Sequence, residues 1–558
     1  MSLKADYILY SDAIFDSVKS EPFAGAVAIA GDKIVYAGEE AGAAEFIGPD
    51  TKIKDFHGKM IMPGFIDAHG HYQTAAIREF GDCISHLEDC RSEEEAVQGV
   101  VEYLKKHPDC KRVHGRCFFL TSFGPGAALP TKHSLDAAVP DIPVYLISSS
   151  GHCSWYNSAA MKEADLEGLL AAHPEWPEEY AVRDEKGELT GFVSENPSFD
   201  IRWRVESYGH EDIAVWDEEY MNYLNSLGVT GFTECNCIAP RVQIDNIEPM
   251  KRLENAGKLT IRYHQWAGTN LIGDDPTEAL KGLEDLKYLQ TYFQTDKLRV
   301  VGEKLMLDGC PDSFTGAMLQ PYAGDPTTSG PLLSDPEAFK QVVAKANEMG
   351  FPVKVHCLGD LSTRTAIDAY EYSRKVNGNH GLRNAVEHMN IISDEDIPRM
   401  HDLDIIASVQ PAHMCDWFNG CGEEIYGPEL VKKDSRYRTL INAGVKIAVG
   451  TDSPVVDSNP IRTVYEAVTR RSWVDGELKC VNPEEAMTVE EVLKGYTVGA
   501  AYANDFEDKV GTLEAGKYAD ICVIDKNLFA IDPEEIKEAK TSAQSLMERL
   551  YMKHRGMH

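Results

Sequence analysis

Short apolar runs and longer amphipathic segments alternate along the middle of the chain. The short runs predict strands, whereas segments such as 335–349 and 394–400, where apolar positions recur every three or four residues, predict helices. Strands that alternate with helices form parallel βαβ units. For a chain of 558 residues, an eight-stranded (β/α)8 TIM-type barrel of the α/β class is the expected closed form. Examples of the short runs are 144–147, 261–264, 304–307, 353–356 and 446–449.

Both ends of the chain instead show short strands separated by turns. Gly31-Asp32 is a hairpin motif between two such strands, and the turn-rich stretch 511–517 precedes another strand at 519–525. We therefore predict a small β-sandwich domain that is built from both termini. The expected domains are 1–62 plus 505–558 for the composite sandwich and 63–504 for the barrel, with an insertion near 120–220 that could cover the barrel mouth.

Composition restricts the partners. Hydrophobic residues make up 43% and charged residues 26% of the chain, which is typical of a globular protein. A net charge of -35 argues against nucleic acid and against anionic membrane surfaces, because both need clustered lysine and arginine. A small-molecule substrate is the expected partner, and a homo-oligomer is a possible assembly.

Location is inferred from the N-terminus and the cysteines. Residues 1–7 contain no apolar core of a secretory leader, and no apolar run approaches the roughly 18 residues that a membrane span needs. The 13 cysteines are odd in number and scattered, as expected of reduced thiols in the cytoplasm.

The strongest candidate chemistry lies at His69-Gly70-His71, directly after the apolar pair Phe65-Ile66. Residues two apart on a strand face the same side, so both imidazoles can reach one metal ion. Gly70 adds no side chain that would crowd such an ion. Taken alone, two unrelated histidines at the end of a strand are an equally good interpretation.

Further candidate ligands follow other apolar runs, where barrel strands would end. Each alone is more simply a hydrogen-bonded histidine or a solvated lysine, but together they favour a metal centre at one end of a barrel. They are Lys304, His356, His388 and Asp452. Glu303 lies beside Lys304, and strand alternation lets only one of the two face the metals. No Gly-x-Ser-x-Gly elbow and no phosphate-binding Gly-x-x-x-x-Gly-Lys-Ser/Thr loop is present.

Several longer motifs surround these candidate ligands. They are Pro63-Gly-Phe-Ile-Asp-Ala-His-Gly-His71, Val355-His-Cys-Leu-Gly-Asp360, Glu387-His-Met389 and Gly450-Thr-Asp-Ser-Pro454, with support from Ser149-Ser-Gly-His152, Asn157-Ser-Ala-Ala160 and Thr190-Gly-Phe-Val-Ser-Glu195. In these motifs the sequence resembles the amidohydrolase superfamily, and within it the amidohydrolase-3 group, which includes the N-substituted formamide deformylases. The resemblance runs from about residue 7 to about residue 540.

The resemblance implies a ligand set and a reaction. His69, His71 and Asp452 would hold one divalent ion and His356 with His388 a second. Lys304, carbamylated to carboxylysine, would bridge them as an anionic ligand. One or two zinc ions are favoured, and manganese, iron and cobalt stay open. A metal-bound hydroxide would attack the substrate, and Asp452 would carry a proton to the leaving group. His152, Trp155 and Glu195 match positions that could face the substrate.

The expected function is a metal-dependent hydrolase that cleaves a non-peptide C–N bond, such as an amide, N-acyl or N-formyl bond, of a small molecule. Two alternatives stay open. The same site could hydrolyse esters or cyclic amides, because a metal hydroxide discriminates poorly. A catalytically silent barrel with a binding or regulatory role would instead be favoured by a missing ligand.

Overall fold

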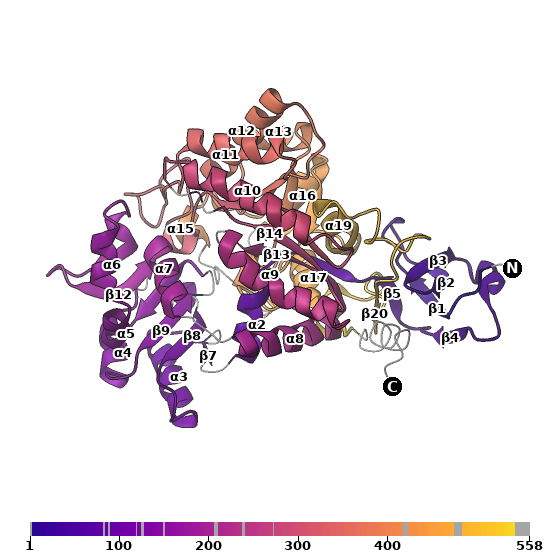
Figure 1. The fold of residues 1–558 in the computed structure, drawn as a ribbon, viewed down its shortest axis with the longest axis horizontal. Coiled ribbons are helices and arrows are strands. Elements are labelled where there is room, and N and C mark those ends of the chain that lie inside the picture. The colour runs from indigo at the N-terminus through magenta and orange to yellow at the C-terminus, as the bar shows by residue number, and fades with distance from the viewer. Residues whose placement is uncertain are drawn as a thin grey trace.

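The computed structural model describes residues 3–81, 84–87, 90–118, 120–123, 128–148, 151–205, 210–236, 240–269, 271, 273–416, 422–473 and 482–541. The strands of these residues form three separate sheets. Figure 1 shows an inserted sheet on the left, a barrel with surrounding helices in the centre and a small β domain on the right.

The central sheet contains eight strands, and every neighbouring pair in it is parallel. This architecture confirms the predicted (β/α)8 barrel. In spatial order the strands are β6 (Phe65–Gly70), β13 (Val229–Asn236), β14 (Arg262–Ala267), β15 (Leu298–Met306), β16 (Val353–Cys357), β17 (Ala385–His388), β18 (Ile406–Val409) and β19 (Ile447–Val449). The outer helices include α10 (Thr277–Tyr292), α11 (Pro336–Glu348), α12 (Asp360–Asn377) and α17 (Pro460–Thr469).

Backbone hydrogen bonds close the barrel between its first and last strands. The Asp452 N–H donates to the His69 carbonyl at 2.7 Å, and the His71 N–H donates to the Ser453 carbonyl at 2.7 Å. A Cβ on Gly450 would lie 2.5 Å from the His69 nitrogen, so glycine permits this approach. Gly70 also has a packing role that the sequence analysis did not identify. A Cβ there would lie 2.4 Å from the Phe232 ring, so glycine is needed for packing.

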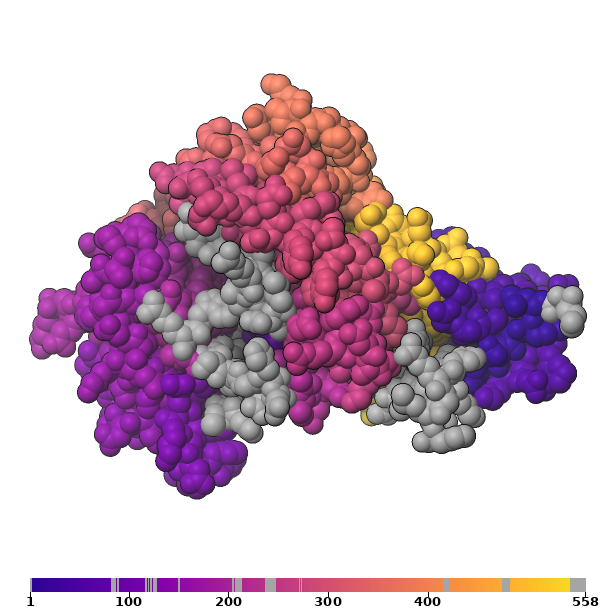
Figure 2. All heavy atoms as spheres, in the orientation of Figure 1, coloured from indigo at the N-terminus to yellow at the C-terminus, as the bar shows by residue number. Residues whose placement is uncertain are grey.

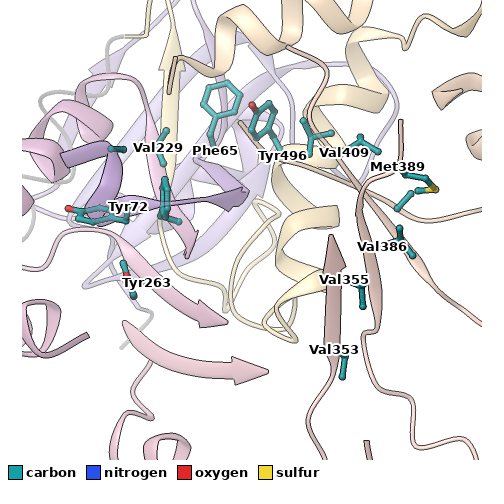
Figure 3. Packing of buried hydrophobic residues seen from close by; sticks show 14 of the residues in the cluster. Phe65, Tyr72, Val229, Tyr263, Val353, Val355, Val386, Met389, Val409 and Tyr496 are labelled. Atoms are coloured by element: carbon teal, nitrogen blue, oxygen red, sulfur yellow. The ribbon is translucent and has the colours of Figure 1, made fainter. Parts of the chain in front are cut away.

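Alternation along the strands separates a polar interior from an apolar outer layer. On β16, Val353 and Val355 belong to the hydrophobic core that Figure 3 shows, together with Phe65 and Tyr496, whose rings meet edge to face at 5.5 Å. The intervening residues Lys354 and His356 face the other side of the strand. All of these strand positions are buried, as expected of a parallel sheet covered by helices. The polar positions therefore meet inside the barrel.

The β domain contains segments from both ends of the chain. β20 (Ile521–Ile524) pairs with β5 (Met60–Pro63) in antiparallel orientation, and β5 pairs with β1 (Tyr7–Ile14) in parallel orientation. The other strands of this six-stranded sheet are β2 (Phe23–Ala30), β3 (Lys33–Gly38) and β4 (Lys52–Asp55). Figure 2 shows the yellow C-terminal residues against the indigo N-terminal ones. The boundaries 1–62 plus 505–558 and 63–504 stay a prediction.

A third sheet lies between the first and second barrel strands in sequence. It contains β7 (Ile84–His86), β8 (Val113–Phe118), β9 (Val144–Ser148), β10 (Cys153–Tyr156), β11 (Ala181–Arg183) and β12 (Leu189–Ser194). The predicted strand 144–147 is therefore part of the insert. The insert's sheet begins at Ile84, earlier than the expected start near residue 120. Within the described ranges, no helix is both long enough and apolar enough to cross a membrane.

One buried ion pair ties the β domain to the barrel. The guanidinium of Arg262, on β14, donates to both carboxylate oxygens of Asp520 at 2.5 and 3.0 Å, and both side chains are buried. Asp520 lies directly before β20.

We expect Asp520→Asn to lower the free energy of unfolding by about 3–5 kcal/mol, because it leaves a buried guanidinium without its carboxylate. Urea unfolding followed by circular dichroism would measure this. The exposed pair Arg183–Glu167 offers a matched control, and Glu167→Gln should change stability by less than about 1 kcal/mol. Equal effects of the two variants would contradict the role of the buried pair.

Candidate metal centre

Two histidines and one aspartate meet where the barrel closes. Oδ1 of Asp452 lies 3.2 Å from Nε2 of His69 and 3.0 Å from Nε2 of His71. The three donor atoms are close enough together for one ion. His69 and Asp452 are buried, whereas the His71 side chain is 30% exposed. The His71 side of this group therefore faces the solvent.

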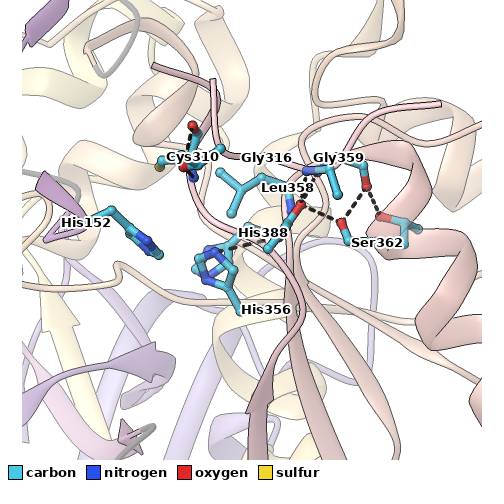
Figure 4. Close-up of polar contacts among 12 residues, drawn as sticks. His152, Cys310, Gly316, His356, Leu358, Gly359, Ser362 and His388 are labelled. Carbon is cyan, nitrogen blue, oxygen red and sulfur yellow. Dashed lines mark hydrogen bonds and ion pairs between the residues drawn. The ribbon is translucent and has the colours of Figure 1, made fainter. Parts of the chain in front are cut away.

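His356 and His388 lie beside this group, at the ends of β16 and β17. The ring centroid of His388 is 4.5 Å from that of His356 and 4.7 Å from that of His69. Figure 4 shows His356 and His388 beneath the loop that carries Leu358 and Gly359. Asp308 holds that loop, since its carboxylate accepts hydrogen bonds from the Gly359 N–H at 2.9 Å and the Ser362 hydroxyl at 2.6 Å.

Strand register decides between Lys304 and Glu303. Lys304 pairs with Lys354 and Met306 with His356, so Lys304 faces the barrel interior with them. Its charge acts in the lowering direction on the pKa of each of the four histidines His69, His71, His356 and His388. Glu303 faces the opposite side and accepts a hydrogen bond from Thr269, and burial raises its pKa to about 8.

The donor set fits a divalent cation. Nε2 of His69, Nε2 of His356 and Oδ1 of Asp452 are buried and make no hydrogen bond to any described residue. Burial holds the pKa of His356 and of His388 well below the usual value, so both imidazoles keep a lone pair for a metal. Burial alone would raise the pKa of Asp452, but His69 and His71 outweigh it and hold that pKa well below its usual range. The carboxylate is therefore ionised.

Among the described residues, polar side chains that the sequence analysis missed also contact the centre, including His413, Glu387 and Gln410. Nε2 of His413, at the start of α14 (His413–Asp416), lies 3.6 Å from Oδ2 of Asp452. It follows an apolar run, so the rule that selected His356 could have found it. Glu387 Oε2 lies 2.6 Å from Nδ1 of His69, and Gln410 Oε1 lies 2.9 Å from Nδ1 of His388. Nothing in the sequence pattern indicated either of these contacts.

Two of the three expected substrate-facing residues approach the centre from the insert. The His152 ring centroid lies 5.1 Å from that of His356, and Figure 4 shows the His152 ring turned toward it. Nδ1 of His152 lies 2.9 Å from Oε2 of Glu195, whose Oε1 accepts a hydrogen bond from Thr315 at 2.8 Å. Burial alone would lower the pKa of His152, but the Glu195 carboxylate outweighs it and raises that pKa.

Trp155 lies apart from this group. Its indole is buried in the hydrophobic core of the insert, against Phe118, and donates a hydrogen bond to the Thr131 carbonyl at 2.9 Å. Among the described residues, Trp155 makes no hydrogen bond and no ring contact to the histidines of the barrel.

Together, the fold and this geometry define a (β/α)8-barrel protein with a cluster of candidate metal ligands at the carboxyl ends of its strands. The chain belongs to the amidohydrolase family, whose model matches residues 52–548. The resemblance that the sequence motifs predicted is therefore confirmed.

Individual relatives agree with this assignment. The N-substituted formamide deformylase of Arthrobacter pascens is 28% identical over 536 residues, which cover 92% of each chain. The exoenzymes regulatory protein AepA of Pectobacterium carotovorum subsp. carotovorum is 29% identical over 373 residues, 66% of this chain and 78% of that protein. The crystal structure of an uncharacterized metal-dependent hydrolase from Pyrococcus furiosus has a TM-score of 0.68 at 25% identity and covers 94% of this chain and 99% of that one. These findings place the chain among the metal-dependent hydrolases.

Protein purified without chelator is expected to contain at least one equivalent of a divalent transition metal, by elemental analysis. Asp452→Ala should remove most of it, because the ion beside His69 and His71 would then lose its anionic ligand. His401→Ala is the matched control, since among the described residues the exposed side chain of His401 makes a hydrogen bond only to the Gly444 carbonyl, at 3.2 Å. A metal-free wild-type protein would refute the metal centre.

Proposed function

We propose that this protein hydrolyses a C–N bond, such as an amide, N-acyl or N-formyl bond, in a small molecule. The observation that carries the proposal is the placement of an ionised, buried Asp452 between histidines at the mouth of the barrel. Such a carboxylate can both hold a cation and exchange a proton with the substrate. The hydrolase class itself follows from the family.

The proposed ligands for one or two divalent ions are His69, His71, Lys304, His356, His388 and Asp452. Imidazole and carboxylate donors suit zinc, and the proposal favours it. When bound, such an ion would polarise the substrate carbonyl and make water a better nucleophile at neutral pH. Carbamylation of Lys304 would turn a buried ammonium into an anionic ligand among the same donors.

Asp452 is the proposed proton carrier. Its two oxygens differ in surroundings. Oδ1 faces His69 and His71, whereas Oδ2 lies 3.8 Å from Nδ1 of His388 and 3.6 Å from Nε2 of His413. One oxygen can thus stay with a cation while the other takes a proton from the attacking water. The same oxygen then delivers that proton to the departing nitrogen, which leaves as a neutral amine.

His152 is proposed to contact the substrate, and Glu195 to hold it in place. Glu195 fixes His152 twice, because its carboxylate meets Nδ1 and its N–H donates to the His152 carbonyl at 2.8 Å. Glu195 is itself buried and has a left-handed backbone, with φ of +50°. A direct substrate role for Trp155 stays a prediction, and its burial in the insert's core favours a supporting one.

The name of one relative favours a non-peptide C–N bond over the alternatives. The Arthrobacter pascens protein, aligned over nearly its whole length, is named a formamide deformylase. Hydrolysis of esters or cyclic amides stays the second enzymatic candidate. A regulatory role also has support, since AepA is named a regulatory protein. All six proposed ligands are present in this chain, which argues against a silent barrel.

Replacing Asp452 by Asn should lower kcat by about 10²- to 10⁴-fold while KM changes far less, because proton transfer is lost but size is kept. The assay is a panel of N-formyl, N-acetyl and N-acyl amino compounds beside aryl esters, with zinc or manganese supplied. His401→Asn serves as a surface control that should keep wild-type kinetics.

Two outcomes of this panel would change the proposal. Faster turnover of every ester than of any amide would move the assignment to an esterase. An Asp452→Asn enzyme as active as the wild type would end the proposed mechanism.

Carbamylation of Lys304 makes a separate prediction. Lys304→Ala should lose bound metal and activity, and added formate or acetate should restore part of both, because a small carboxylate can occupy the space of the missing carbamate. The same acids should not activate the wild-type protein. An unmodified lysine, seen by mass spectrometry and crystallography with two ions bound, would rule the bridge out.

A further inference from the structure

Three buried polar side chains form one connected group beneath the histidines of the candidate centre. Glu387 is its middle member: Oε1 lies 3.0 Å from Nζ of Lys354, and Oε2 lies 2.6 Å from Nδ1 of His69. The amide nitrogen of Gln410 donates to Oε2 of Glu387 at 3.4 Å. All three members are at most 1% exposed.

Two members of this group each accept a hydrogen bond from a histidine of the candidate centre. Glu387 accepts a hydrogen bond from Nδ1 of His69, and Gln410 Oε1 accepts one from Nδ1 of His388. A ring whose Nδ1 carries the donated proton keeps its lone pair on Nε2. The group therefore fixes both the orientation and the tautomer of two histidines at once, with Nε2 as the free ligand atom of each.

Lys354 adds a backbone contact to the same group. Its ammonium donates to the Ala68 carbonyl at 2.8 Å, directly before His69 on β6. Lys354 thus joins Glu387 to the strand that carries His69. It also supplies the positive charge that an ionised, buried Glu387 needs.

Local backbone geometry explains how Glu387 and His388 can both serve the centre although they are adjacent. Register pairs Glu387 with His356, so Glu387 faces the barrel interior. A regular strand would then turn His388 outward, like its partner Cys357. His388 instead has a φ of +69°, and Met389 has a φ of +49°. Such backbone is costly for residues other than glycine, so the structure around it must maintain it.

We propose that Glu387 and Gln410 are positioning residues of the metal centre, which hold His69 and His388 through one shared hydrogen-bonded group with Lys354 as its counter-charge. The inference rests on the proposed function, because it assumes that these histidines bind a cation. Residues that hold a ligand's second nitrogen typically set metal affinity by about 10- to 100-fold. The opposing interpretation is that the three residues only fill the barrel interior.

The test is the affinity of the metal-stripped full-length protein for Co²⁺, measured by competition with a chelator, together with the visible absorption of bound Co²⁺. Glu387→Gln should weaken affinity by about 10- to 100-fold and change the spectrum, because the amide is a weaker acceptor for His69. Gln410→Met keeps a side chain of similar size and should also weaken the affinity for Co²⁺, because His388 then loses its hydrogen-bond acceptor. Ser408→Ala is the matched control, since Ser408 is buried on β18 and its hydroxyl makes no hydrogen bond to a described residue.

A double variant separates positioning from folding. Glu387→Gln alone leaves Lys354 buried without its carboxylate, so the apoprotein should lose thermal stability. Lys354→Met combined with Glu387→Gln removes both charges and should recover most of that stability, but Co²⁺ affinity should stay low.

Wild-type affinity and spectrum in Glu387→Gln and Gln410→Met would overturn the inference, as would recovery of affinity in step with stability in the double variant. A wild-type protein that binds no Co²⁺ would instead overturn the proposed function.

Discussion

The contacts that close the barrel are made by the residues of the candidate centre. Asp452 and His69 share a backbone hydrogen bond, as do His71 and Ser453, each at 2.7 Å. The first and last strands of the barrel are therefore held together within a few ångströms of the donor atoms. Any separation of these strands would pull Asp452 away from His69 and His71. The same contacts therefore stabilise the barrel and set the geometry of the candidate metal ligands. Gly450 permits these contacts, because a Cβ there would collide with the backbone of His69.

Much of the fold and part of the site could be predicted because they depend on periodicity alone. The runs 353–356 and 446–449 became barrel strands, and Lys304 faces the interior with His356 because alternation and register require it. Prediction was less complete where strands of two different sheets show the same apolar sequence pattern. The run 144–147 is apolar like a barrel strand, yet it pairs within the inserted sheet. Only long-range pairing decides which sheet receives such a strand.

The contacts that sequence could not reveal depend on backbone geometry that breaks periodicity. Alternation allows only one of Glu387 and His388 to face the interior, but the left-handed backbone at His388 brings both to the centre. The insert raises a similar problem. Glu195 is far from His152 in sequence, and its left-handed backbone at the start of α7 (Glu195–Val205) lets it meet Nδ1. Such pairs become visible only in three dimensions.

Charge balance inside the barrel links the lysines to the proposed cations. Lys304 and Lys354 are neighbours across β15 and β16, and like charges directly opposite each other are unfavourable. With Glu387 and Asp452 ionised, two positive and two negative groups already balance, so a divalent ion would add an uncompensated charge in a buried site. Carbamylation of Lys304 removes one positive charge and adds one negative charge. These four groups would then balance one divalent cation, and the repulsion between the two lysines would become an attraction. Charge balance among these four side chains would thus support the proposed carbamylation of Lys304 in a centre that holds one divalent ion.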